Sequence, residues 1–576
     1  MNEDNISMTC AALSFFALVG AFIFGGIAGN TKNPYYLLGV AVALILIVII
    51  AYVKVKLINI VNYKNFKEHW GNFERRKRNF KATQKFFELT RKEDSNFSID
   101  DQTWADLNMD ELFQLIDRTV TSPGEEMLYK ILREPELKEK KLLERNKVIK
   151  LFKDNDEIRN KIGMELVRLG RMKDNGVYSI ITKDFNVNYK YKYLFNFLAA
   201  VFLFSVITIP IFKLKFVIIA AGLFVINSLQ HGKFKRDVES YINSLGYLNG
   251  IIHIAKNISK FENDEIKHYT EILKRTSKNA SVIVKQTAGL QVSDGTRDPI
   301  IELLYSVFLI EERKFFSSIS DIKKYRDDLK ELYRNLGELD ALMAVASFRE
   351  WIGEEYTEPE FVNSENTIET EEVYHPLVKD AVANSICLEN KGIILTGTNM
   401  SGKSTFLRTI GVNALLAQTI YTCTAKFYKT SFFKIMTSIS PEDNISSGKS
   451  YYFREAEALK RIINECGDEP VLCIVDEIFR GTNPVERVNA AAEILNYISR
   501  HNTLTLVATH DLELTEILKD KYSCYYFTED INEEGLNFDY KIKDGVCKNR
   551  NAIKLLKYLE YPEEIIEKTN ERLLKI

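Results

Sequence analysis

One glycine-rich segment of the 576-residue chain carries residue types that bind nucleotide phosphates. It reads Gly397-Thr-Asn-Met-Ser-Gly-Lys-Ser-Thr405, which matches G-x-x-x-x-G-K-S, and it follows the apolar run 393–396. A strand, a glycine-rich turn and a helix in this order present backbone N–H groups and the positive end of the helix to phosphate oxygens. We predict that Lys403 reaches the β- and γ-phosphates of ATP and that Ser404 contacts Mg²⁺. The residues predicted to bind the nucleotide are Gly397, Thr398, Asn399, Met400, Ser401, Gly402, Lys403, Ser404 and Thr405.

Two further apolar runs end in residues suited to catalysis. The run 471–475 ends in Asp476 and Glu477, and the run 504–509 ends in His510. We predict that Asp476 holds the Mg²⁺ shell and that Glu477 orients or deprotonates the attacking water. His510 is predicted to contact the γ-phosphate or that water. The three motifs, in this order, are typical of a P-loop ATPase of the ABC-like branch.

A small polar segment lies in sequence between the glycine-rich segment 397–405 and the Asp476-Glu477 pair. Residues 446–450 read Ser-Ser-Gly-Lys-Ser and precede the predicted helix 451–463. An ordinary helix N-cap loop is one interpretation. In ABC-like ATPases such a segment completes the site of the opposite subunit, so Ser447, Gly448 and Ser450 are predicted to act in trans within a homodimer.

Four apolar stretches without charged residues form two pairs along the chain. The first pair covers Met8–Ala28 and Tyr35–Val53, and the second covers Tyr193–Phe212 and Phe216–Leu229. A bilayer-spanning helix needs about 20 apolar residues, so we predict two transmembrane helical hairpins. A signal peptide is the alternative for the first stretch, but its start is acidic and a second span follows at once. Because Phe216–Leu229 is short for a full crossing, a buried helical hairpin stays open as the alternative for the second pair.

Basic residues flank both pairs. They are Lys54, Lys56, Lys64, Lys67, Arg75, Arg76, Lys77 and Arg78 after the first pair, Lys190 and Lys192 before the second, and Lys233, Lys235 and Arg236 after it. Lysine and arginine are enriched on the cytoplasmic side of membrane spans. We therefore predict a multi-pass cell-membrane protein, with the lipid bilayer as a partner and with the ATP site in the cytoplasm.

The rest of the chain divides into helical and mixed segments. Apolar residues at spacings of three and four predict helices over 104–170. A long charged stretch low in Gly and Pro predicts further helices over 233–349. From residue 367, short β-rich runs alternate with helical stretches, which predicts an α/β domain with a mainly parallel sheet. The predicted divisions are a transmembrane hairpin (1–60), a basic juxtamembrane helical linker (61–100), the first part of a helical core (101–190), a second transmembrane hairpin (191–230), a helical core and lever region (231–366) and the P-loop ATPase domain (367–576).

Charge and cysteine content narrow the class of protein further. The formal net charge is −2, which gives no overall basic excess of the kind that indicates a nucleic-acid binder. The seven cysteines contain no C-x-x-C pair. They are predicted to be reduced thiols in a cytosolic environment, not ligands of a metal or parts of a disulfide framework.

The C-terminal motifs resemble those of the MutS family. The family's phosphate loop reads TGPNM-x-GKST-x-LR, and residues 396–408 match it with Thr398 in place of proline. His375-Pro-Leu-Val378 resembles the family's HP-hydrophobic segment, and Leu415-Leu-Ala-Gln418 resembles its LLAQ helix. Residues 447–450 are similar to its SGxS signature. The resemblance covers about 370–576 strongly.

Other segments extend the resemblance. Asp476-Glu477 with residues 480–482 is similar to the family's DE-x-x-RGT, and residues 116–135 resemble the start of its core domain. Leu339-Asp340 with Ala344 and Ala346 looks like the end of its lever helix. The resemblance implies an ATPase that works as a homodimer, moves helical arms and binds mismatched DNA.

The chain also departs from the family pattern. We find no mismatch-reading N-terminal domain with its F-x-E wedge; two apolar stretches occupy that place, and a second pair interrupts the core region. No nuclease-like tail follows the ATPase, and residues 233–349 are short for a full lever and clamp. DNA binding and mismatch repair are therefore implied by the resemblance alone.

Three classes of function fit these sequence features. The leading hypothesis is a membrane-anchored MutS-like ATPase whose arms act on DNA or on a membrane or protein partner. The alternative is an ABC-like transporter, or a membrane-partner-remodelling ATPase that does not bind DNA. A non-hydrolysing scaffold gated by ATP is a third class, against which the Asp476-Glu477 pair argues. Further protein partners are not predicted.

Overall fold

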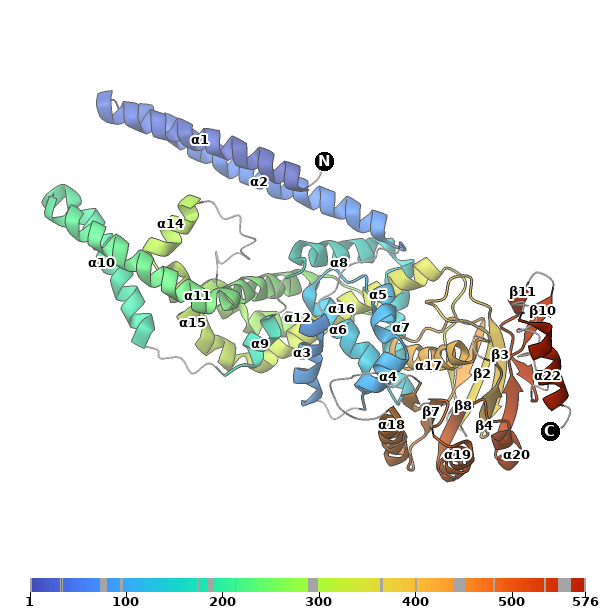
Figure 1. Cartoon of the computed structure of the whole chain (residues 1–576). Coiled ribbons are helices and arrows are strands. Elements are labelled where there is room, and N and C mark those ends of the chain that lie inside the picture. Colours follow the sequence, from blue (N-terminus) through green and yellow to red (C-terminus); the bar gives the residue numbers. More distant parts are fainter. Residues whose placement is uncertain are drawn as a thin grey trace. The chain divides into compact units, whose positions relative to one another are not determined.

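A computed structural model describes residues 3–31, 33, 35–72, 80–93, 97–172, 176–184, 190–212, 214–287, 299–362, 366–398, 401–439, 451–479, 482–532, 535–546 and 561–573 (Figure 1). The chain forms two compact units. The first comprises Met1–Glu74, Thr119–Glu125 and Leu151–Met343, and the second comprises Arg75–Arg118, Glu126–Lys150 and Ala344–Ile576. The first unit is helical, and all the described strands belong to the second.

The first unit consists of long and short helices. They are α1 (Glu3–Thr31), α2 (Tyr36–His69), α8 (Asp156–Leu169), α9 (Val177–Thr182), α10 (Lys190–Phe212), α11 (Leu214–Ile258), α12 (Lys267–Asn279), α13 (Ser281–Thr287), α14 (Pro299–Val307) and α15 (Ile310–Lys324). Three more helices contribute residues to both units, namely α6 (Ser122–Arg133), α7 (Glu139–Asp154) and α16 (Arg326–Ile352).

Four helices of the described chain are long and apolar enough to cross a bilayer. The qualifying segments are Asn5–Thr31, Tyr36–His69, Lys190–Ile209 and Lys215–Phe234. They form two hairpins, α1 with α2 and α10 with α11 (Figure 1). Their surfaces carry exposed large apolar side chains, a property that marks interaction sites when the patch is contiguous. The expected helical pairs are therefore present, and their insertion into a membrane stays a prediction.

Helix α11 contains the short stretch Phe216–Leu229, whose crossing of a bilayer stays a prediction. That stretch lies in the first half of one unbroken 45-residue helix. The qualifying segment is 20 residues long, which matches the length that a bilayer requires. The same helix continues beyond this segment to Ile258, and its residues Leu245, Leu248 and Ile251 are buried in the core of the first unit.

Helix α2 differs from the expected arrangement. The basic juxtamembrane helical linker was predicted to begin at residue 61, but α2 runs without a break to His69 and is followed by a turn in which Gly71 has φ +70°. The ring of Trp70 stacks on the Arg159 guanidinium of α8 at 4.2 Å. Phe66 packs against α8 as well, where a Cβ on Gly163 would lie 2.4 Å from its ring. These contacts favour continuation of the apolar helix. Residues 80–91 of the predicted linker form a separate helix, α3.

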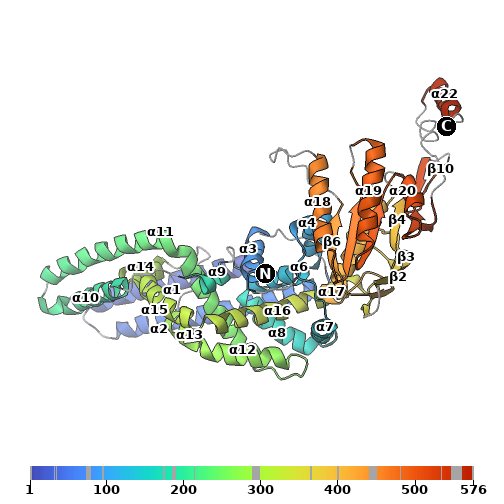
Figure 2. The same cartoon turned by 90° about the horizontal axis from the view of Figure 1, so that it is seen from below.

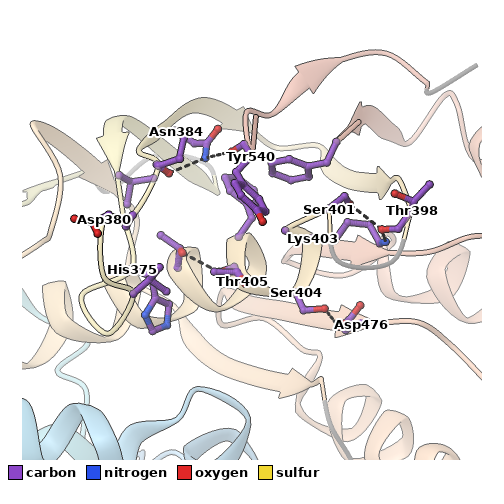
Figure 3. A pocket seen from close by; sticks show the side chains of 18 of the residues that line it. His375, Asp380, Asn384, Thr398, Ser401, Lys403, Ser404, Thr405, Asp476 and Tyr540 are labelled. Carbon is purple, nitrogen blue, oxygen red and sulfur yellow. Dashed lines mark hydrogen bonds between the residues drawn. The ribbon is translucent and has the colours of Figure 1, made fainter. Parts of the chain in front are cut away.

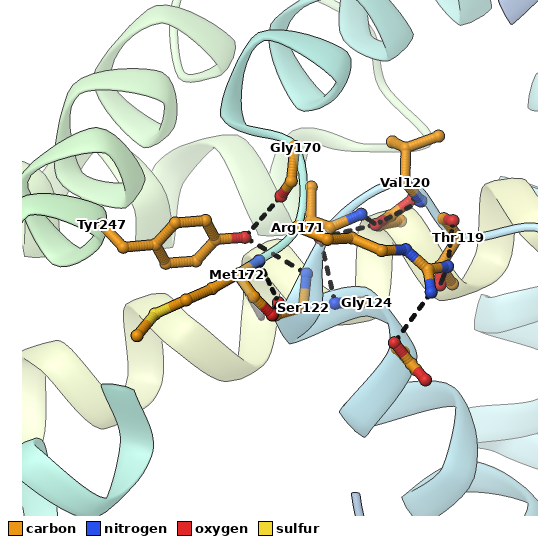
Figure 4. A network of polar contacts seen from close by, with 11 residues as sticks. Thr119, Val120, Ser122, Gly124, Gly170, Arg171, Met172 and Tyr247 are labelled. Atoms are coloured by element: carbon orange, nitrogen blue, oxygen red, sulfur yellow. Dashed lines mark hydrogen bonds and ion pairs between the residues drawn. The ribbon is translucent and has the colours of Figure 1, made fainter. Parts of the chain in front are cut away.

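A buried polar network connects α16, α6 and α11 within the first unit (Figure 4). The Asp340 carboxylate accepts hydrogen bonds from the backbone N–H of Thr121 at 2.8 Å and from its hydroxyl at 2.6 Å. Arg171 pairs with Glu125 at 2.8 Å, and the Tyr247 hydroxyl donates to the carbonyl of the residue before Arg171 at 2.6 Å. Burial raises the pKa of Asp340 to about 6, against the effect of these hydrogen bonds. The network fixes the turn that precedes α6.

The second unit contains the sheets. Its other helices are α3 (Phe80–Arg91), α4 (Asp101–Asp106), α5 (Met109–Ile116), α17 (Lys403–Ile420), α18 (Tyr451–Glu465), α19 (Pro484–Ile498), α20 (Glu513–Ile517) and α22 (Glu563–Leu573). Its strands are β1 (Glu360–Phe361), β2 (Thr367–Val373), β3 (Asn384–Glu389), β4 (Gly392–Thr396), β5 (Phe427–Thr430), β6 (Lys434–Ser438), β7 (Val471–Asp476), β8 (Thr503–Ala508), β9 (Tyr522–Tyr526), β10 (Glu529–Asn532), β11 (Gly535–Phe538) and β12 (Lys543–Asp544).

The largest sheet has the strand order β12-β9-β4-β8-β7-β6. All its pairs are parallel except β12 with β9. A second sheet has the order β1-β5-β2-β3, and β10 pairs with β11 as an antiparallel hairpin. The sequence predicted this mixed architecture, with helices before residue 367 and alternating strands and helices after it.

Helices cover both faces of the large sheet, so its central strands are apolar throughout. Every residue of β4, β7 and β8 is buried. Successive side chains of a strand point to opposite faces: Cys473 belongs to the core formed with α18 and α19, whereas Ile474 packs against Gly411 of α17. Figure 2 shows α18 and α19 as neighbours beside the sheet. The burial of both faces explains the uninterrupted apolar runs in the sequence.

A substitution at Gly124 tests the packing of the polar network around Asp340. A Cβ at this position would lie 2.1 Å from the Asp340 carboxylate oxygen. We expect Gly124→Ala to destabilise the protein by about 1–3 kcal/mol, because the buried carboxylate has no room to move. Gly232→Ala is the matched control, since this helical glycine has no atom within 4 Å of the added Cβ. Thermal unfolding of the detergent-solubilised chain measures both; equal midpoints would contradict the packing described.

Candidate functional site

The main cavity of the second unit lies where β4, β7 and β8 end. Parallel strands present their carboxyl ends at one edge of a sheet, where α/β proteins bind ligands. The cavity has a volume of about 810 Å³ and is lined by Thr398, by residues 401–406, by the Asp476–Glu477 pair and by His510 (Figure 3). Three sequence motifs that are far apart in the chain are thus brought to one place.

The turn between β4 and α17 has a backbone shape that requires glycine. Gly397 has φ +144° and Gly402 has φ +104°, values that side-chain-bearing residues rarely adopt. A Cβ on Gly397 would lie 2.6 Å from the Phe527 carbonyl oxygen. Gly402 directly precedes α17, so the N-terminus of that helix faces the cavity. This turn is the cradle for an anion that the glycine spacing predicts.

Lys403 is folded back onto this turn. It is 5% exposed, and its Nζ donates hydrogen bonds to the carbonyls of Gly397 at 2.8 Å and Thr398 at 2.7 Å. The Ser401 hydroxyl donates to the same Thr398 carbonyl at 2.8 Å. The ammonium group therefore lies within the loop that would surround a phosphate, as its position in the motif predicts.

Ser404 and Asp476 meet across the cavity. The Ser404 hydroxyl donates a hydrogen bond to the Asp476 carboxylate, which is buried at the end of β7. Within the described residues no three His, Cys, Asp or Glu side chains form a metal cluster. A hydroxyl with one carboxylate still suits Mg²⁺, which keeps several waters and takes its other ligands from substrate phosphates.

Glu477 and His510 form the third part of the site. The His510 Nε2 lies 3.0 Å from the Glu477 carboxylate. The Glu477 backbone has φ +60°, an uncommon conformation for a residue other than glycine, and its N–H donates to the Ala508 carbonyl at 2.8 Å. Such backbone strain clusters at functional sites. The two residues predicted to act on water are therefore in direct contact.

His375 closes another wall of the cavity. Its Nδ1 accepts a hydrogen bond from the Leu377 N–H at 3.3 Å, so the neutral ring carries its proton on Nε2. Burial lowers the pKa of His375 to about 4, and the positive charge of Arg408 acts in the same direction. The ring is therefore uncharged at neutral pH.

Two wall residues were not predicted. Tyr540 has φ +50°, and its ring lies against Gly402, where an added Cβ would be 3.2 Å away. Asn384 of β3 holds this segment, because its side chain donates to the Tyr540 carbonyl at 3.0 Å and accepts from the Ile542 N–H at 2.8 Å. Asn384 and Tyr540 are far apart in the chain, so local sequence patterns give no signal for their meeting.

Several predicted residues lie outside the described part of the chain. They are Asn399 and Met400 of the phosphate loop and Ser447, Gly448 and Ser450 of the segment predicted to act in trans. The other predicted residues are described: Gly397 forms the turn, and Thr398, Ser401, Gly402, Lys403, Ser404 and Thr405 line the cavity with Asp476, Glu477 and His510.

Two protein-family models match the chain. The MutS domain V family matches residues 393–576, which contain the cavity's phosphate turn, and the MutS domain III family matches residues 82–346. The chain belongs to the MutS family. The resemblance in the motifs is thereby confirmed over most of the chain.

Three curated proteins illustrate the relationship, each named DNA mismatch repair protein MutS. The protein of Thermotoga maritima is 31% identical over 271 residues, covering 46% of this chain and 34% of the relative. That of Staphylococcus aureus is 31% identical over 331 residues, covering 54% and 36%. That of Thermosipho melanesiensis is 26% identical over 513 residues, covering 80% and 61%. This MutS-family chain thus spans between a third and three fifths of these relatives.

The pKa of His375 predicts how acid affects the second unit. The unfolded chain takes up a proton near pH 6.5, whereas the folded histidine does so only near pH 4. Stability should therefore fall as pH drops from 6.5 towards 4, by about 2 kcal/mol at pH 5. In His375→Asn, whose Oδ1 replaces Nδ1 as the acceptor, this part of the loss should be absent. Thermal unfolding at pH 7 and pH 5 makes the comparison; an equal acid-induced shift in both proteins would contradict the account.

Proposed function

We propose that the second unit binds and hydrolyses ATP at the cavity between β4, β7 and β8. The observation that carries this proposal is the meeting of Lys403, Ser404 and Asp476 at a glycine turn that leads into a helix N-terminus. The helix end, the backbone N–H groups and the ammonium group all favour a polyphosphate. Tyr540, on the cavity wall, offers an aromatic face on which a nucleotide base can stack.

Different residues of the cavity bind the phosphates, hold Mg²⁺ and act on water in this proposal. On phosphate binding, we expect Lys403 to exchange its two carbonyl acceptors for phosphate oxygens. Mg²⁺, when bound beside Ser404 and Asp476, supplies positive charge to those oxygens. Glu477 acts as the general base towards water, and His510, at 3.0 Å from its carboxylate, orients that carboxylate.

The active form is proposed to be a homodimer. The segment containing Ser447, Gly448 and Ser450 lies in sequence between the phosphate loop and the Asp476-Glu477 pair, where ABC-like ATPases carry the residues that complete the opposite subunit's site. Membership of the MutS family supports this arrangement. It also supports DNA as a partner, because the relatives are named DNA mismatch repair proteins.

The protein is further proposed to be anchored in the cell membrane by two helical hairpins. Four described helices meet the length and hydropathy needed for a crossing. Exposed side chains on them include Phe22 at 72%, Leu38 at 72% and Ile207 at 64%. Leaving such a surface in water is unfavourable by roughly 25 cal/mol per Å². The basic flanks favour a cytoplasmic ATP site.

Replacing Glu477 tests the hydrolysis step. Glu477→Gln should bind ATP nearly as well as the wild type but hydrolyse it at least about 100-fold more slowly, because an amide does not accept the proton of water. Lys403→Ala should instead lose binding, since a phosphate-facing charge is removed. Glu513→Gln, at an exposed position on α20, is the control. ATPase and nucleotide-binding assays of the detergent-solubilised chain measure both properties; wild-type turnover by Glu477→Gln would refute the base assignment.

The anchor is tested by extraction and labelling. The protein should stay with membranes in alkaline carbonate, and a cysteine introduced at Asn33 should react with an impermeant thiol reagent on intact cells. The native Cys387, which is exposed in the second unit, is an internal control and should react only after permeabilisation. Recovery of the full chain in the soluble fraction without detergent would contradict the anchor.

A further inference from the structure

The C-terminal end of α17 is held by a buried arginine. An α-helix leaves its last carbonyl groups without partners inside the helix, and these need donors from elsewhere when the end is buried. Helix α17 starts at Lys403 in the phosphate turn and ends at Ile420, with most of its residues buried. Its two ends therefore depend on different partners: the phosphate site at the first, and outside donors at the second.

Arg349 of α16 supplies these donors. Its side chain is fully buried. Its Nη2 donates to the carbonyls of Tyr421 at 2.7 Å and Ile420 at 3.3 Å, and its Nε donates to the Thr422 hydroxyl at 2.9 Å. One planar guanidinium thus binds three consecutive residues at the end of α17, a geometry that a lysine does not reproduce.

The charge of Arg349 is compensated from the segment that follows α16. Its Nη1 lies 3.5 Å from the Glu358 carboxylate, and the guanidinium lies 5.2 Å from the centre of the Tyr356 ring. Glu358 is itself held by α7, through Lys150 at 2.9 Å and the Asn146 amide at 3.0 Å. A buried charge is retained only with such partners.

Backbone pairing reinforces the same junction. Thr357, after α16, and Cys423, after α17, exchange two hydrogen bonds of 2.9 Å each. On α7, Arg145 donates to the Thr419 carbonyl at 3.2 Å. A displacement of α17 along its axis therefore acts directly on the last turns of α16.

We propose that Arg349 is a positioning residue that transmits nucleotide binding at the N-terminus of α17 to α16. The inference rests on the proposed nucleotide site and adds the route by which that site acts on the helix Arg326–Ile352, whose first part belongs to the first unit. A helix that is buried along most of its length moves as a rigid element when a ligand binds tightly at one end, so its other end carries the displacement.

Hydrogen exchange of α16 with and without a non-hydrolysable ATP analogue and Mg²⁺ tests this role in the detergent-solubilised full chain. In the wild type, the analogue should slow exchange of the amides of residues 344–352 by about 5-fold or more. In Arg349→Met the analogue should still bind, but this change should fall below about 2-fold. Arg349→Lys should restore only part of it. Glu350→Gln, an exposed neighbour on α16, should behave as the wild type.

Different outcomes separate the claims. Binding without any change in α16 of the wild type, or with an equal change in Arg349→Met, would overturn the role of Arg349 and leave the nucleotide site standing. Failure of the wild type to bind the analogue would overturn both. If Arg349→Met does not fold, Thr422→Val removes one acceptor of the same guanidinium and should reduce the change in α16.

Discussion

Three parallel strands, β4, β7 and β8, end side by side, and their register determines where the phosphate turn, Asp476, Glu477 and His510 lie in the cavity. Leu395 of β4 pairs with Ala508 of β8, and the same Ala508 pairs with Asp476 of β7. All three strands are buried on both faces, so a slip of one residue would exchange the two sets of side chains between opposite cores. The phosphate turn, the carboxylates and His510 follow these paired ends within one or two residues, so the chemistry depends on the packing of the sheet.

The sequence predicted those parts of the fold that local patterns determine. The apolar runs predicted β4, β7 and β8 because each is buried throughout, and the glycine spacing predicted the turn before α17. The two apolar stretches Tyr193–Phe212 and Phe216–Leu229 predicted separate helices, as observed in α10 and α11. The predicted helical linker starts at residue 61, whereas α2 continues to His69, where Phe66 and the following Trp70 contact α8. Tyr540 and Asn384 were missed because their meeting depends on long-range packing.

The two units differ in the solvent that their surfaces suit. The second unit buries its apolar residues around a sheet and directs polar groups into a cavity. The hairpins of the first unit do the reverse, since their apolar side chains point outwards. Their helices α2 and α11 are continuous with the polar core of the same unit. The proposed membrane anchor accounts for the outward-facing apolar side chains of the hairpins.

Calorimetric titration of the detergent-solubilised full chain with a non-hydrolysable ATP analogue tests the central claim most directly. We expect one bound nucleotide per chain, tighter binding with Mg²⁺ than without it, and loss of binding in Lys403→Ala. The Asp476→Asn variant should still bind the nucleotide, but its affinity should no longer depend on Mg²⁺. No heat of binding in the wild type, or equal affinity in Lys403→Ala, would contradict the account.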